Sequence, residues 1–139
     1  MLIRWLQAFI AGFVSMMSFH QGLQGLLHRL GISQTAAFDM TPVPPLGIPS
    51  VISLAFWGGL WGIVLWLLIH NQSGFAFLAW AVVLGAVLPS IVALFVMYPL
   101  QGLPMGGGYD PRLIVGALLL NGAWGLGTAW LLRLMAQAR

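Results

Sequence analysis

Charged residues are scarce in this sequence. Of its 139 residues only 5% are charged, while 60% are hydrophobic. Soluble domains usually carry about 25% charged residues, and a chain this apolar could not cover a water-facing surface with polar groups. The shortage of charge therefore excludes an ordinary soluble domain and predicts that a lipid bilayer surrounds most of the chain.

Cysteine is absent and acidic residues are few. The lack of cysteine excludes disulfides, thiolate catalysis and cysteine-ligated metals. The only acids are Asp39 and Asp110, and neither falls within a long apolar stretch, which argues against a proton antiporter built on an intramembrane carboxylate. All five cations are arginines, namely Arg4, Arg29, Arg112, Arg133 and Arg139. They form no basic patch that could follow a phosphate backbone, so nucleic acid is not an expected partner.

What the sequence does contain is four long apolar stretches. A spanning helix needs about 20 mostly apolar residues, and each stretch reaches that length. They cover about residues 2–30, 48–69, 75–97 and 111–135. The first is too long for the apolar core of a signal peptide, which has roughly 7–15 residues, so we expect a retained helix. The sequence predicts an all-α integral membrane protein, a bundle of four transmembrane helices forming a single domain over residues 1–139.

The breaks between the stretches carry turn residues. Segment 31–47 holds three prolines, which favour extended backbone over helix. The short 70–74 segment predicts a tight hairpin, and segment 98–110, with three consecutive glycines, is expected to be mobile. Asp110 followed by Pro111 is a favourable helix start, because Asp accepts from free amides and Pro at the first position loses no hydrogen bond.

Arginine counts predict the orientation in the membrane. With four spans, both termini and the 70–74 turn share one side, which holds three arginines. The other side holds two arginines, offset by the two acids. The excess of positive charge predicts a multi-pass protein of the plasma (inner) membrane with both termini in the cytoplasm.

Small residues recur four positions apart, a spacing that lets helix backbones approach closely in lipid. The pairs are Ser18 and Gly22, Gly58 and Gly62, Ala81 and Gly85, and Gly125 and Ala129. One motif also repeats, because the sequence Gly-Leu-Trp-Gly at 59–62 returns as Gly-Ala-Trp-Gly at 122–125. The repeat predicts two related helical hairpins, as in parallel-repeat transporters. The first and third helices show no matching similarity, so coincidence remains the alternative.

Polar side chains within the predicted spans are the candidate binding residues. His20, Gln24 and His28 lie four positions apart in the first helix, and with Gln21 they occupy one face. Depth counted from the helix ends places residues of all four helices in the outer half of the bundle, and polar groups there must pair or meet water. The predicted cluster comprises His20, Gln21, Gln24, Ser53, Ser90 and Asn121. Hydrogen bonds that merely join helices are the structural alternative.

Chemistry beyond binding finds little support. The sequence contains no HExxH, no GxSxG and no readable pair of nucleophile and base, so we expect neither an enzyme nor a metal site. Only His20 is deep enough to ligate a haem, and His28, on the same helix, could not supply the opposite ligand. We expect no cofactor, although a haem shared by two chains through their His20 residues stays open.

Two functions remain. The first is a small, homo-oligomeric membrane protein that binds or passes a small solute through the polar cluster. The alternative is a non-catalytic accessory subunit that stabilises a larger membrane complex through lipid-facing tryptophans and small-residue seams. The expected partners are therefore the lipid bilayer and either further copies of the chain or other membrane subunits. A hydrated cavity around His20 favours the first function, and a filled core with an exposed tryptophan and glycine face favours the second.

Overall fold

The computed structural model describes residues 1–138, so the predicted role of Arg139 in orientation lies outside the described residues. Its helical segments are α1 (Leu2–Ser15), η1 (Met16–His20), α2 (Gln21–Arg29), α3 (Ser50–Ile69), α4 (Gly74–Val92), η2 (Ala93–Met97), α5 (Tyr98–Leu100), η3 (Met105–Tyr109) and α6 (Pro111–Gln137). All of these segments except η3 belong to four helices long and apolar enough to cross a membrane, at Leu2–Arg29, Ser50–Ile69, Gly74–Leu100 and Pro111–Gln137. The prediction of four membrane-length helices is confirmed.

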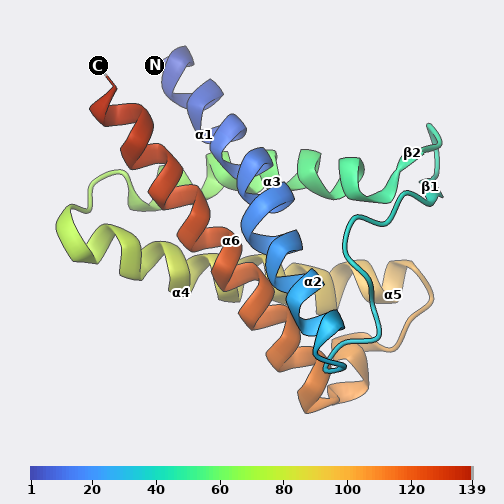
Figure 1. The fold of residues 1–139 in the computed structure, drawn as a ribbon. Helices are drawn as coiled ribbons and strands as arrows, with labels where there is room; N and C mark the ends of the chain where they lie inside the picture. The colour runs from blue at the N-terminus through green and yellow to red at the C-terminus, as the bar shows by residue number, and fades with distance from the viewer. Residues whose placement is uncertain (139) are drawn as a thin grey trace.

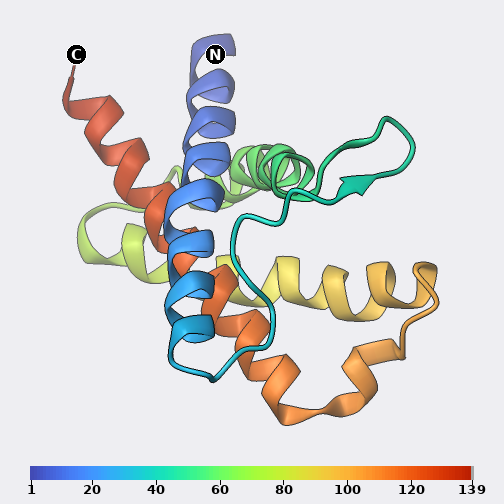
Figure 2. The ribbon, with the colours of Figure 1, turned by 45° about the vertical axis from the view of Figure 1, so that its right-hand side comes forward.

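The four helices form two crossing layers. Figure 1 shows α1 and α6 running steeply in front of α3 and α4, and Figure 2 shows α3 foreshortened where α4 is seen lengthwise, so α3 and α4 diverge from each other. The closest packing joins α1 to α3 and α4 to α6, and α1 also packs on α6, whereas α3 and α4 touch little beyond their connecting turn. The four helices therefore do not share one direction.

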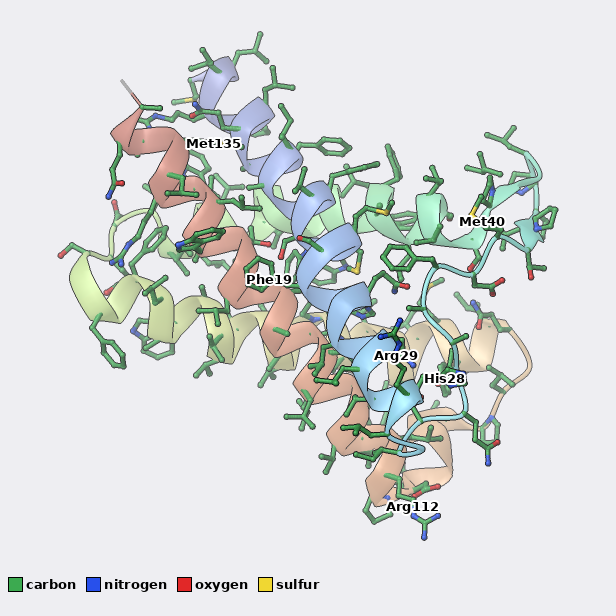
Figure 3. The ribbon with its side chains drawn as sticks, viewed as in Figure 1. Phe19, His28, Arg29, Met40, Arg112 and Met135 are labelled. Atoms are coloured by element: carbon green, nitrogen blue, oxygen red, sulfur yellow. The ribbon has the colours of Figure 1, made fainter. Side chains whose placement is uncertain are left out.

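The chain termini lie at the same end of the molecule in both views (Figures 1 and 2). We call the end where α1 begins, α3 turns into α4 and α6 finishes the inner end. The opposite, outer end carries the connections 30–49 and 101–110. Figure 3 shows the two ends through their labelled side chains, with Met135 near the termini and Arg112 at the far end of α6.

Glycines allow α1 and α3 to touch through their backbones. A Cβ added at Gly62 would collide with the carbonyl oxygen of Ala8 and lie 2.9 Å from the Cα of Gly12. A Cβ added at Gly12 would in turn collide with the carbonyl oxygen of Gly58. No side chain larger than hydrogen fits at this crossing, so the predicted role of Gly58 and Gly62 as packing residues is confirmed.

The crossing of α4 and α6 uses the same device. A Cβ added at Gly125 would collide with the carbonyl oxygen of Ala81 and lie 3.1 Å from the Cα of Gly85. The predicted placement of Gly125 at a helix contact is therefore confirmed. Ala81 and Gly85 stand to Gly125 as Ala8 and Gly12 stand to Gly62, so the first and third helices share an Ala-x-x-x-Gly motif at their crossings. The expectation that these two helices have no matching similarity was wrong.

One predicted small-residue pair does not pack. Ser18 and Gly22 are both exposed, and a Cβ added at Gly22 would meet nothing within 4 Å. The first helix instead turns Ala8, Ala11 and Gly12 inward, all of which are buried. The spacing rule found the right type of contact but the wrong face, because several small pairs compete on one glycine-rich helix.

Trp124 of α6 fills the centre of the molecule and joins α6 to α1. Its side chain is 1% exposed, and its Nε1 donates a hydrogen bond to the carbonyl oxygen of Gly12 at 3.0 Å. Its own carbonyl oxygen accepts from the Oγ of Ser15 at 2.6 Å and from the Oγ1 of Thr128 at 2.8 Å. The core is therefore a packed indole held by interhelical hydrogen bonds. Figure 3 shows Phe19 between the first helix and α6.

The outer connections have local structure of their own. Strands β1 (Pro42–Val43) and β2 (Ile48–Pro49) pair antiparallel in a short hairpin. In η3, residues 106–108 are glycines with φ values of 64° to 66°, a left-handed conformation that other residues rarely adopt. Asp110 then accepts a hydrogen bond from the amide of Arg112 at 2.9 Å, which confirms the predicted start of α6.

Candidate functional site

The glutamines of the predicted polar cluster bind the chain's own first connection. The Nε2 of Gln24 donates to the Oγ of Ser33 at 2.9 Å and to the carbonyl oxygen of Thr35 at 2.5 Å. The Oε1 of Gln21 accepts from the amide of Phe38 at 2.7 Å. Both glutamines are buried, because the segment after α2 folds back over their face. These hydrogen bonds hold the connection against α2, and we call the two glutamines with the residues they bind the clasp.

The clasp fixes an otherwise costly backbone conformation. Phe38 has a φ of 56°, in the left-handed region that bulky residues avoid. The hydrogen bond from its amide to Gln21 helps to hold it there. His28, at the end of the predicted polar face, donates from Nδ1 to the carbonyl oxygen of Ser33 at 3.0 Å, while its side chain remains exposed. The polar face of α2 therefore binds backbone along much of its length.

The remaining predicted residues fall into separate groups. The Nδ2 of Asn121 donates to the Oγ of Ser90 at 2.9 Å, which joins α6 to α4. The Nδ1 of His20 lies 3.1 Å from the Nε2 of Gln21, its neighbour in sequence. Within residues 1–138, His20 makes no hydrogen bond to Asn121, Ser90 or Ser53. The structure thus brings two pairs of the six residues together through hydrogen bonds and leaves Gln24 and Ser53 outside them.

Asp39 and Asp110 bind local groups at the outer end. The hydroxyl and the amide of Thr41 donate to Asp39 at 2.6 and 2.9 Å, and these hydrogen bonds lower the pKa of the Asp39 carboxyl. Asp110 caps α6 as described above. Both acids accept hydrogen bonds from neighbours in sequence, so each serves a turn or a helix start.

A second candidate site, which sequence reasoning missed, is a cavity of about 240 Å³ at the inner end. It forms where the start of α1, the α3–α4 turn and the end of α6 meet. We call it the inner cavity, and its lining residues include Arg4, Gln7, Trp66, His70, Gln72, Ser73, Gly74, Phe77 and Arg133. Two arginines and several polar groups thus face one hollow, and none of the six residues predicted from the sequence lines it.

Arg133 is held in place at one wall of the inner cavity. Its guanidinium lies over the ring of Phe77, 5.5 Å from the centroid, and donates a hydrogen bond to the carbonyl oxygen of Gly74. A guanidinium has five N–H donors, so these contacts leave others available. On another wall, the ring of His70 stacks on Trp66 with centroids 5.1 Å apart, and its Nδ1 donates to the carbonyl oxygen of Leu67.

The inner cavity also receives the first turn of α4. The first amides of any α-helix lack intrahelical partners, and the Ser73 side chain makes no capping hydrogen bond. Of the residues at the start of α4, Ser73, Gly74 and Phe77 line the cavity. The only hint in the sequence was the arginine excess at this end, which we interpreted as a signal of orientation. Nothing in the local pattern showed that residues from four helices converge.

The chemistry available at these sites is binding by hydrogen bonds and positive charge. Within residues 1–138, no three His, Cys, Asp or Glu side chains gather where they could hold a metal ion. At the outer end, the amide groups of Gln21 and Gln24 are already hydrogen-bonded to the segment after α2. The inner cavity, in contrast, offers hydrogen-bond donors. Comparison with family models, curated proteins and solved structures found no match to this chain, so its function is argued from this geometry alone.

Proposed function

We propose that this chain is a non-catalytic accessory subunit of the plasma membrane that stabilises a larger membrane assembly. The observation that carries the proposal is the engagement of the deep polar groups. Gln21, Gln24 and Asn121, which a solute would have to contact, bond to other parts of the chain. These hydrogen bonds stabilise the folded chain, because unpaired polar groups in lipid are costly.

The outward surface supports the same role. On α3, the side chains of Phe56 and Trp57 are 48% and 54% exposed and lie in edge-to-face contact with each other. Aromatic residues are enriched where membrane and soluble proteins meet partners, because large rigid rings bury area at a small cost in conformational entropy. We infer that this face of α3 contacts either another subunit or a second copy of the chain.

Site-specific photo-crosslinking tests the proposal. With a photoreactive phenylalanine analogue at Trp57, irradiation of the native membrane should give one discrete protein adduct. The same analogue at Trp124, which is 1% exposed, is the matched control and should give none. An adduct of about twice the chain mass of 15.0 kDa identifies a second copy, and any other discrete mass identifies a different subunit. Adducts to lipid alone contradict the proposal.

The effect of His20→Ala separates this role from solute binding or passage. An accessory subunit should lose thermal stability in detergent, because the contact between His20 and Gln21 beside the clasp is lost. In proteoliposomes, neither the wild-type protein nor His20→Ala should then show solute flux. Flux through the wild-type protein that disappears in His20→Ala, with an unchanged melting temperature, would instead establish the solute function.

For the orientation, we propose that both termini and the α3–α4 turn are cytoplasmic. The arginines near this end exceed those near the other, which favours its retention inside. Reporter fusions at Ser73 and at the C-terminus should therefore report cytoplasm, and fusions within 31–47 or 98–110 should report the outside. A C-terminal fusion that reports the outside reverses the assignment.

We also propose that the two hairpins, α1 with α3 and α4 with α6, arose by duplication. The repeated Gly-x-Trp-Gly of α3 and α6 supports this origin, and so does the Ala-x-x-x-Gly shared by α1 and α4. In the first hairpin, Gly62 packs against Ala8 and Gly12. In the second, Gly125 packs in the same way against Ala81 and Gly85. Two motifs that meet in the same way at both crossings are harder to obtain by chance than either motif alone.

A further inference from the structure

We propose that the inner cavity is a binding site for a phosphate group. This inference is independent of the accessory role, because it concerns a ligand at the inner end and not a partner on α3. It rests on a hollow lined by two arginines, on the absence of a described acid beside them, and on the position of the hollow at the end of the membrane-length helices.

The charges in the inner cavity are unbalanced within the described chain. Arg4 and Arg133 both line it, and residues 1–138 contain only two acids, both bonded at the outer end. Two like charges that share a partly desolvated hollow repel each other, and a bound anion removes that cost. The arrangement therefore selects for a negatively charged ligand.

The donors present suit phosphate in particular. Arginine presents a planar fork of N–H groups that matches phosphate oxygens two at a time. Arg133 is already positioned by Phe77 and Gly74, so less side-chain freedom is lost when the ligand binds. Ser73 and Gly74, at the start of α4, also line the hollow. The Nδ1 proton of His70 is donated to Leu67 and so is not available to a ligand.

The size of the cavity limits what enters it. Sites for drug-sized ligands usually measure about 300–1,000 Å³, and the inner cavity measures about 240 Å³. A headgroup phosphate or a small soluble phosphate therefore fits a cavity of this volume better than a larger metabolite does. Trp66 and Phe77 supply apolar walls on which the glycerol part of a lipid could lie.

The location favours a lipid as the source of the phosphate. Arg4 is in the first turn of its helix and Arg133 in the last turns of α6, so both lie where the spans meet the headgroups. Exposed tryptophans near this end, Trp5, Trp80 and Trp130, mark the same interface. Basic pockets between helices at a membrane surface are known to hold anionic headgroups.

Native mass spectrometry of the full-length protein in a neutral detergent tests the proposal, with phosphatidylglycerol, phosphatidylcholine and inorganic phosphate as the probes. Wild-type protein should retain phosphatidylglycerol more tightly than phosphatidylcholine. Arg4→Gln and Arg133→Gln should each weaken the binding of phosphatidylglycerol about fivefold, since one arginine near a membrane surface contributes about that factor to the affinity. Arg133→Lys should weaken it less, because the charge remains and only the fork is lost.

Arg112→Gln is the matched control, because it removes the same charge at the outer end. Equal weakening by Arg112→Gln, or undiminished binding by the double variant of Arg4 and Arg133, overturns the proposal. If Arg133→Gln unfolds, Arg4→Gln decides alone, because Arg4 is exposed and makes no side-chain hydrogen bond within residues 1–138. If millimolar inorganic phosphate raises the melting temperature of the wild-type protein but not that of Arg4→Gln, the ligand is a soluble phosphate. A response to phosphatidylglycerol alone supports the lipid.

Discussion

Gly125→Ala should destabilise the folded protein by about 2 kcal/mol or more. The added methyl group would collide with the carbonyl oxygen of Ala81 and the Cα of Gly85, and backbone atoms cannot move aside as a flexible side chain can. The α4–α6 crossing must therefore widen, and the loss of close packing is severe where lipid supplies no hydrophobic drive. Titration of the detergent-solubilised protein with dodecyl sulfate, followed by circular dichroism, measures the change.

Gly116→Ala in the same helix is the control for this prediction. A Cβ at Gly116 meets nothing within 4 Å, so the free energy of unfolding should stay unchanged or rise slightly, as alanine favours helix over glycine. Gly62→Ala should reproduce the loss at the α1–α3 crossing, because its added Cβ meets Ala8 and Gly12 in the equivalent way. Equal tolerance of Gly125→Ala and Gly116→Ala would show that the helices do not approach through these glycines.

Trp124→Ala is expected to have the largest effect of any single substitution, about 3–5 kcal/mol. It empties the centre of the molecule and removes the hydrogen bond from the indole to Gly12. Trp124→Phe separates the two contributions, because it keeps much of the volume and loses the donor. The hydrogen bond should account for about 1 kcal/mol of the total, as is typical between membrane helices.

Trp61→Ala is the informative comparison, since Trp61 occupies the same position as Trp124 in the repeated motif. From the repeat alone, the two substitutions should cost the same. In the structure Trp61 is only partly buried, because α3 and α4 pack little against each other, so its loss should cost clearly less. The same dodecyl sulfate titration checks both, and a larger cost at Trp61 than at Trp124 would contradict the asymmetric packing.

Sequence reasoning succeeded where the determining forces are local or simply cumulative. Four helices followed from the length of the apolar stretches, and their bounds differ from the predicted ones by three residues at most. The start of α6 followed from Asp110 and Pro111, because capping involves residues adjacent in sequence. Gly62 and Gly125 were found through their spacing, since a close crossing needs a bare backbone at regular helical intervals.

Sequence reasoning failed where the outcome depends on which distant segments meet. Ser18 and Gly22 satisfy the same spacing as Gly58 and Gly62 yet face outward, because the choice of face depends on the neighbouring helix. The depth argument placed Asn121 and Ser90 in one cluster, and these two side chains share a hydrogen bond. It could not show that the segment after α2 covers Gln21 and Gln24, because the path of an irregular connection follows no periodic pattern.

The sequence by itself determined that this is a chain of four membrane-length helices with an arginine excess at one end, because hydropathy and charge are properties of segments. Only the tertiary structure decided that the outer polar face is occupied by the chain's own backbone, and that Arg4 and Arg133 share the inner cavity. These two arginines are separated by most of the chain, and they meet because the glycine crossings fix how α1, α3, α4 and α6 converge. Such convergence is a property of the packed whole, which no local pattern encodes.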